Sequence, residues 1–451
     1  MNKDRINWID VGNEAAEILS RYIQFDTSNP PGNEEEAVRF LADILDREGI
    51  SHEIIKSAPG RCSIRASIPG DDSRGVILLS HADVVPADSS KWEKAPFSGE
   101  RADGHVWGRG SLDDKGEGVI GLMVMLLLSR LKIPLKRDLV FLATADEETG
   151  GKYGAGHVAE THGNLINARV LLNEGGGPLS GVLTDGRLLY MIGVGEKGPL
   201  WLTLRCVGTS GHGSVPVKDN AVIRMSRALA RLGTRKRPVR FSKQAVGTFT
   251  SLGKALGGIG GLVLRSSGVS FLRPLAALAA SMKDKNLEAM IRDTVSVTTF
   301  QSGIKANVIP DEAVATIDCR LLPGTDKEEF LSWLRRALGD DGIEISEILY
   351  APPSISPSDT DSYREIERLI ITMYPDAVCV PMINTGFTDS RYFRSLGIDC
   401  YGLSTAPLTI EDMARIHGKD ERISERALLE GIKSMFHLAC GLCGSDAIQQ
   451  T

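Results

Sequence analysis

Histidines and carboxylates recur along this chain at positions where they could form a metal-dependent hydrolytic site. The segments that carry them are His81-Ala82-Asp83, Asp113-Asp114, Asp146-Glu147-Glu148, Glu174 and His417. Each falls at or near the C-terminal end of a predicted strand, the edge of an α/β sheet at which ligands gather. Imidazole and carboxylate groups bind zinc and other divalent cations. The series therefore predicts a dinuclear metal centre.

The first histidine follows the apolar run Val76–Leu79. A neutral imidazole at His81 can bind zinc, and Asp83, two positions further on in an extended chain, projects to the same side and can fix the imidazole tautomer. The alternative is a strand-end histidine that is only hydrogen-bonded, and this spacing taken alone favours that alternative, because a single histidine is a weak metal signal.

Two adjacent acids, Asp113 and Asp114, lie in a turn framed by glycines, from Gly108 to Gly116. Adjacent buried carboxylates repel each other, so a cation is expected nearby, and a carboxylate that spans two metal ions removes the repulsion. The alternative is an N-cap for a helix that runs through Met125. A cap accounts for one aspartate but not for the pair, which favours the metal site.

The acidic triplet Asp146–Glu148 follows the apolar stretch Leu139–Ala143. Neighbouring glutamates on a turn point in different directions, so one can bind metal while the other acts as a general base. A solvated acidic loop is the alternative. Further along, Glu174 ends another apolar run and is followed by glycines, and His417 supplies a second histidine.

Strands and helices alternate in the N-terminal part of the chain. Glu34–Glu48 has the apolar spacing of a helix, and short strands are predicted at Ile64–Ile68, Val76–Leu79, Leu139–Ala143 and Val170–Asn173. This alternation predicts an α/β fold with a mostly parallel sheet that helices cover.

After Gly193 the pattern changes to half-buried strands and amphipathic helices. The strands are Leu200–Val207 and Val314–Leu321, and the helices are Ala221–Leu232 and Lys327–Leu338. Strand, helix, strand, strand, helix, strand is the order of a ferredoxin-like unit. Residues 235–294 interrupt this order and have no clear periodicity. We expect a catalytic domain from residues 1–194 and 351–451, completed by helices at Asp361–Met373 and Ser424–Leu438, and an inserted α+β domain at 195–350.

The composition and net charge of the chain indicate which classes of binding partner to expect. The 451 residues carry a net charge of −6, with 42% hydrophobic and 24% charged residues, typical of a globular protein. No basic stripe is evident, so neither nucleic acid nor membrane is expected, and a small-molecule substrate fits better. Met1–Arg5 lacks a signal segment, and the apolar run Val119–Leu128 is too short to span a bilayer. We expect a cytoplasmic protein.

Seven scattered cysteines are typical of reduced, buried thiols. Cys440 and Cys443 also have the spacing of half a zinc site or of a redox pair, but no second pair accompanies them. We therefore interpret them as thiols near a helix end.

Together these motifs resemble the M20 family of dizinc metallopeptidases and deacylases over nearly the whole chain. The matching segments are His81–Asp83, Trp92 with Pro96-Phe97, Gly108–Gly116, Asp146–Glu148, Asn173–Gly176, Gly211–Ser214, Asn307–Pro310 and His417. The long segment before Val308 is more similar to the carboxypeptidase S and aminoacylase branch than to the desuccinylases.

The resemblance implies a role for each candidate ligand. Asp113 would bridge two divalent cations, with His81 and Glu174 on one cation and Glu148 and His417 on the other. Zinc is the expected metal, with cobalt and manganese as alternatives. Glu147 would be the general base and Asp83 the partner that orients His81, and the peptide between Asp113 and Asp114 would be cis.

For the inserted domain, the resemblance implies a lid and a homodimer interface. His212 would polarise the scissile carbonyl, often across the dimer interface, while Asn307 and Arg320 would hold a free carboxylate of the substrate. Arg320 also fits an ordinary salt-bridged strand residue, although a planar guanidinium suits carboxylate binding. The loop Thr385–Asp389 would line the substrate pocket with its backbone at Gly386.

The expected reaction is metal-dependent hydrolysis of an amide bond next to a free carboxylate. A carboxypeptidase or dipeptidase is the first prediction, and an N-acyl-amino-acid deacylase is the alternative, because both use the same catalytic residues. A catalytically inactive, carboxylate-binding scaffold is a more remote alternative, which the full set of candidate ligands disfavours.

Overall fold

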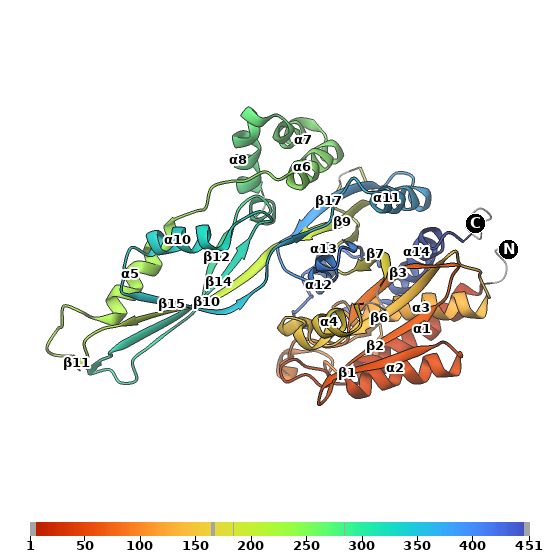
Figure 1. Cartoon of the computed structure of the whole chain (residues 1–451), viewed down its shortest axis with the longest axis horizontal. Coiled ribbons are helices and arrows are strands. Elements are labelled where there is room, and N and C mark those ends of the chain that lie inside the picture. The colour runs from red at the N-terminus through yellow and green to blue at the C-terminus, as the bar shows by residue number, and fades with distance from the viewer. Residues whose placement is uncertain (1–5, 164–166, 184, 284, 446–451) are drawn as a thin grey trace.

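The computed structural model describes residues 6–163, 167–183, 185–283 and 285–445. Two large sheets organise this part of the chain, and Figure 1 shows them toward opposite ends of an elongated molecule. A ten-stranded sheet with its helices forms one end, and a four-stranded sheet extends toward the other. Residues 1–5, in which the sequence indicates no signal segment, lie outside the described residues.

The large sheet has the order β1-β2-β6-β3-β7-β18-β9-β16, and β8 and β17 also pair with β9. Its strands are β1 His52–Ala58, β2 Arg61–Ile68, β3 Asp72–His81, β6 Arg137–Thr144, β7 Ala168–Asn173, β8 Gly177–Leu179, β9 Leu189–Glu196, β16 Ser354–Ile355, β17 Val378–Asn384 and β18 Asp399–Gly402. The central strands β6, β3, β7 and β18 are parallel neighbours. The predicted mainly parallel sheet is confirmed at the centre, whereas β1, β2, β8 and β16 add antiparallel pairings that were not predicted.

The apolar runs form strands because both faces of the sheet are covered. In β3, Val76 and Leu78 join the larger hydrophobic core, while Ile77 and Leu79 join the core on the opposite face. The larger core is completed by α1 Trp8–Ile23, α2 Glu35–Arg47, α3 Lys115–Arg130, α11 Asp361–Met373 and α14 Glu425–Leu442, and the smaller one by α4 His157–Thr161 and α12 Ser390–Ser395. The apolar run Val119–Leu128 is buried inside α3. Among the described residues, no helix has the length and apolarity to cross a bilayer.

The smaller sheet is antiparallel, with the order β12-β14-β10-β15. Its elements follow along the chain as β10 Gly198–Val207, α5 Ala221–Thr234, β12 Thr294–Ser302, β14 Glu312–Leu321, α10 Lys327–Leu338 and β15 Ile343–Tyr350. This is the predicted ferredoxin-like order. Leu200, Leu202 and Leu204 point into a core shared with α5 and α10. The function of this unit as a lid, and the predicted domain boundaries, remain predictions.

The segment without clear periodicity folds into short helices. They are α6 Lys243–Leu256, α7 Gly258–Arg265, α8 Arg273–Lys283 and α9 Lys285–Ala289. In Figure 1, α6, α7 and α8 form a separate lobe above the junction of the two sheets. Gly257 and Gly258 both have positive φ at the break between α6 and α7. This break between short helices interrupts the periodicity that would have revealed them in the sequence.

All seven cysteines are free and buried, as the sequence predicts. Cys440 lies in α14, and Cys443 is the residue at its C-terminal end. Both belong to the larger hydrophobic core, so their spacing reflects packing.

Candidate metal centre

Three neighbouring parallel strands bring the first histidine and two carboxylates to one edge of the large sheet. His81 is the last residue of β3, Glu174 follows β7 directly, and Glu148 lies in a short turn after β6. In the register of the sheet, His81 is opposite Thr144 of β6. The strands therefore end side by side, at the carboxyl edge where the sequence places these residues.

Asp113 and His417 reach the same edge from loops that are far apart in the sequence. A small sheet joins these loops, because β19 (Arg422–Ser424) pairs with β5 (His105–Trp107), which in turn pairs with β4 (Arg101–Ala102). His417 follows α13 (Ile410–Met413) and has a left-handed backbone, with φ of 58°.

Glu421 fixes the loop that presents Asp113, a role the sequence did not indicate. Its carboxylate Oε1 accepts hydrogen bonds from the backbone N–H groups of Gly110 (3.1 Å), Leu112 (2.8 Å) and Asp113 (3.2 Å). Its other oxygen lies 2.5 Å from Nη1 of Arg109. Glu421 is fully buried, so this network holds the two loops of the site against each other.

The candidate ligands form two groups that share Asp113. His81 Nε2 lies 3.0 Å from Asp113 Oδ1, and His417 Nε2 lies 3.0 Å from Asp113 Oδ2. The first group is His81, Asp113 and Glu174, and the second is Asp113, Glu148 and His417. In each group the candidate ligand atoms all lie within 4.8 Å of one another. One carboxylate between two such groups is the arrangement predicted for a dinuclear centre.

The electrostatics of this cluster match a cation site. Burial and the charge of Asp113 raise the pKa of Glu174 to about 8, and burial and the charge of Glu174 raise the pKa of Glu147 well above its usual range. Hydrogen bonds to Asp113 and Glu148 raise the pKa of His417 to about 10. Ionised carboxylates this buried and this close need cations among them. Two imidazoles with three carboxylates suit zinc and similar divalent cations.

The N-cap alternative for the aspartate pair does not account for either acid. Asp113 contacts the two histidines, while Asp114 occupies the N-cap position of α3 without a capping hydrogen bond from its side chain. Instead, Oδ2 of Asp114 accepts a hydrogen bond from the backbone N–H of His81 at 3.2 Å. The peptide between the two aspartates is cis, as the family resemblance implies.

Asp83 contacts His81 through its backbone. Nδ1 of His81 lies 2.9 Å from the carbonyl oxygen of Asp83 and 3.6 Å from its carboxylate. The carboxylate instead accepts hydrogen bonds from the backbone N–H groups of Glu147 (3.0 Å) and Glu148 (3.1 Å), and from the Asn29 side chain (2.8 Å). The Asp83 carbonyl thus selects the imidazole tautomer that leaves Nε2 free for metal, and its carboxylate positions the acidic turn.

The acidic triplet is not a solvated loop. Glu147 and Asp146 are buried, and Asp146 has a left-handed backbone with φ of 70°. Nη2 of Arg61 lies 2.6 Å from the Asp146 carboxylate and so balances the charge of this acid, which belongs to neither ligand group. Among the described residues, the two candidate histidine ligands form their ion pairs with Asp83, Asp113 and Glu148, not with Glu147.

Two of the predicted substrate residues lie together at the junction of the sheets. Arg320 stacks over the ring of Phe387, which neighbours Gly386, at 5.2 Å, and over Trp201 at 5.8 Å. Its guanidinium also donates to both carboxylate oxygens of Asp318, at 2.7 Å and 3.0 Å, so the salt-bridged alternative is observed and the substrate role of Arg320 stays a prediction. Glu196, unassigned from the sequence, anchors the loop by accepting a hydrogen bond from Thr388 N–H at 2.5 Å.

The other two, His212 and Asn307, lie at the far tip of the smaller sheet. β11 (Gly211–His212) pairs with β13 (Val308–Ile309), and the N–H of Gly213 donates to the Asn307 carbonyl at 2.8 Å. Both His212 and Asn307 are exposed. Figure 1 shows β11 at the end of the molecule away from β3, β6 and β7. Within one chain, the structure does not bring them to the metal centre.

The model of peptidase family M20/M25/M40 matches residues 77–440. The chain belongs to this family. It is 31% identical over 413 residues to the human N-fatty-acyl-amino acid synthase/hydrolase PM20D1, covering 88% of this chain and 79% of that protein. It is 30% identical over 386 residues to a probable carboxypeptidase S-like 2 of Dictyostelium discoideum, covering 80% and 70% of the two chains. The chain is therefore an enzyme of the M20 hydrolase family.

A solved structure of similar fold is the M20 family metallo-carboxypeptidase Sso-CP2 of Sulfolobus solfataricus. Its TM-score is 0.74 at 20% identity, covering 95% of this chain and 99% of that chain. This similarity confirms the α/β fold.

Proposed function

We propose that this chain hydrolyses an amide bond next to a free carboxylate, with two divalent cations held by His81, Glu174, Glu148 and His417 and shared through Asp113. The observation that carries the proposal is the pair of ligand groups that meet at the Asp113 carboxylate. Zinc fits the donor set best, with cobalt or manganese as substitutes. When bound, such cations supply Lewis-acid activation of water and of the substrate carbonyl.

Glu147 acts as the general base. Its carboxylate is buried beside the ligand groups, and its backbone N–H is held by Asp83 at 3.0 Å. Burial raises its pKa, which favours a group that takes a proton from the attacking water and returns it to the leaving amine. The fixed position of the turn keeps this carboxylate oriented throughout turnover.

The substrate carboxylate is bound by Arg320 and Asn307, with the backbone at Gly386 lining the pocket. Arg320 already faces the loop of Gly386 through Phe387. Because His212 and Asn307 are exposed at the distant tip, we propose that a second subunit of a homodimer supplies them to the metal centre. His212 then polarises the carbonyl that is attacked.

N-acyl amino acids are the first substrate class to test. Relatives at 30% identity or more include N-fatty-acyl-amino acid synthase/hydrolases, such as the human protein, and a carboxypeptidase S-like protein, which makes dipeptides the second class. Incubating the zinc-loaded enzyme with N-acyl amino acids of increasing acyl length and with dipeptides separates the two. Hydrolysis of neither class, with two metal ions bound per chain, would support the inactive scaffold instead.

The base assignment is tested by Glu147→Gln. The glutamine keeps the size of the side chain but cannot accept the proton, so turnover should fall by about 10³-fold or more. Elemental analysis should still find the wild-type metal content. Glu160→Gln, at an exposed position of α4, is the matched control and should retain activity. Near wild-type turnover of Glu147→Gln would show that another group is the base.

A further inference from the structure

The lobe formed by α6, α7 and α8 exposes large apolar side chains to solvent. Ile259 is 84% exposed, Phe271 80% and Met282 78%. The others are Leu256, Leu262, Val269, Leu275 and Leu278. Single exposed apolar residues are ordinary on a protein surface. Eight large apolar side chains exposed on the short helices and turns of one lobe instead indicate an interaction surface.

The packing of α8 is inverted relative to that of a water-soluble helix. Its buried residues are Ala276, Ala277 and Ala280. The larger Leu275, Leu278 and Met282 point outward, and their spacing places them along one side of the helix. A helix that packs only against its own protein would bury its largest apolar groups. In α8 the small alanine side chains pack into the internal core, and the larger leucine and methionine side chains form an outer face.

Charge in this region has one sign. From Lys243 to Lys283, the span of α6 to α8, the sequence contains five lysines and arginines and no aspartate or glutamate, although the whole chain has a net charge of −6. Lys254 in α6 and Arg265 at the end of α7 are both exposed. An apolar face accompanied by lysine and arginine is the combination that binds anionic lipid surfaces.

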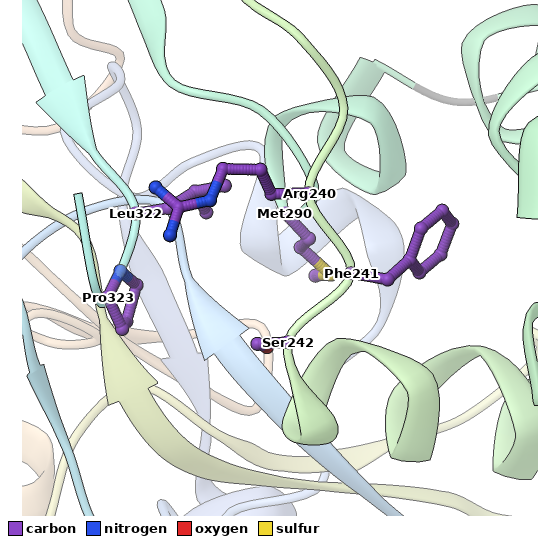
Figure 2. Close-up of a pocket in the computed structure, with 6 residues that line it drawn as sticks. All are labelled: Arg240, Phe241, Ser242, Met290, Leu322 and Pro323. Atoms are coloured by element: carbon purple, nitrogen blue, oxygen red, sulfur yellow. The ribbon is translucent and has the colours of Figure 1, made fainter. Parts of the chain in front are cut away.

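The lobe is held in place on the body of the enzyme. Thr248 of α6 donates to the Pro381 carbonyl of β17 at 2.5 Å. At the other end of the attachment, the segment Arg240–Ser242 leads into α6. It lines a cavity of about 100 Å³ together with Met290, which follows α9, and with Leu322 and Pro323, which follow β14, as Figure 2 shows. There, Nη2 of Arg240 donates to the Gly324 carbonyl at 2.9 Å. The outer face is therefore presented in a fixed direction and is not an unanchored segment.

We propose that the outer face of α7 and α8 docks on an anionic lipid surface, lying in its interface without crossing it. A second copy of the chain fits less well, because a symmetric contact would bring two surfaces of the same basic charge together. The proposal is independent of the reaction catalysed. It departs from the expectation of no membrane partner. That expectation used the net charge of the whole chain, which does not report that acidic residues are absent from the lobe.

The test is co-sedimentation of the full, metal-loaded chain with vesicles of phosphatidylcholine alone or with about a third phosphatidylglycerol, at low and at high salt. The chain should sediment with the anionic vesicles only, and high salt should weaken binding. The apolar variant Leu275→Ser/Leu278→Ser/Met282→Ser and the charge variant Lys254→Glu/Arg265→Glu should each reduce binding by about tenfold or more. The control Ile9→Ser/Leu396→Ser, exposed positions of the catalytic part, should bind as wild type.

Metal content and hydrolysis of a soluble substrate verify that each variant is folded. The charge variant alters only exposed side chains, so it keeps the test decisive if the apolar variant does not fold. A wild-type chain that stays in the supernatant with anionic vesicles at low salt overturns the proposal. So does an oligomer without lipid affinity that dissociates when the apolar face is changed, since the occupant would then be a second copy.

Discussion

The metal-centre edge of the large sheet and the tip formed by β11 and β13 are built in opposite ways. At the edge, His81, Asp83 and Glu147 are buried, and a further buried acid, Glu421, fixes the adjoining loop. At the tip, His212 is exposed and its ring hydrogen-bonds locally to Ser214 at 2.7 Å. The edge is organised within one chain. The tip exposes its candidate residues and, within one chain, lies away from that edge.

Removing the shared carboxylate of Asp113 should have the largest effect on the metal centre. Asp113→Ala takes one ligand from both groups, so we expect loss of both cations and a fall in turnover of about 10⁴-fold or more. Elemental analysis and assay of the purified variant check this. Glu147→Gln should lose turnover yet keep its metal, and two cations retained by Asp113→Ala would contradict the shared-ligand arrangement.

The tip should affect turnover without affecting the metal. We expect His212→Ala to lower turnover by about 10²-fold with unchanged metal content, because one polarising group is lost. Mixing this variant with Glu147→Gln in equal amounts should restore about a quarter of wild-type sites if subunits exchange and His212 acts across a homodimer. No recovery in a mixture that demonstrably forms mixed dimers would place His212 and Glu147 in the same chain's site.

Loss of the buried acid behind Asp113 should have a smaller effect. In Glu421→Ala, the N–H groups that its carboxylate binds lose their acceptor, and we expect metal affinity to fall by about 10- to 100-fold. Competition with a chelator measures the change. Glu425→Ala removes a neighbouring acid whose exposed partner is Arg101, and it should leave the affinity unchanged. Equal affinities for the two variants would show that the network around Glu421 does not support the site.

The last prediction concerns the stability of the fold, not turnover or metal binding, and its residue is Lys197 at the joint between β9 and β10. Its buried amino group donates to the Arg292 carbonyl and to Thr294 Oγ1, both at 2.9 Å. Burial lowers its pKa from 10.5 to about 7. Between these values the unfolded chain binds a proton that the folded chain lacks, so the free energy of unfolding rises with pH, by about 1.4 kcal/mol per unit at the steepest.

The stability that Lys197 contributes is therefore complete above pH 10.5 and is lost as the pH falls to about 7. Lys197→Met should show a smaller rise in unfolding free energy between pH 7 and 9.5, measured by urea denaturation. Lys285→Met, at an exposed position, should keep the wild-type slope. The same slope for wild type and Lys197→Met would mean that Lys197 stays protonated when folded.

Elements with strong periodicity were predictable from the sequence. The helices Lys327–Leu338 and Asp361–Met373 have the predicted bounds, because their apolar residues recur at helical spacing. The antiparallel edge strands and the lobe at 243–283 were not predicted. Whether a strand is parallel or antiparallel depends on which strand it pairs with, and a single strand's sequence does not specify its partner. The helices of the lobe are short and are interrupted by glycines, so their apolar periodicity is weak.

The sequence alone determined the chemistry of the centre, because residue type sets which groups can bind a divalent cation and local apolar runs place three of them at strand ends. The tertiary structure decided which acids share one site. Pairing of β19 with β5 brings His417 to Asp113, and hydrogen bonds direct the Asp83 carboxylate to the Glu147 turn. These contacts join residues far apart along the chain, so no local pattern specifies them.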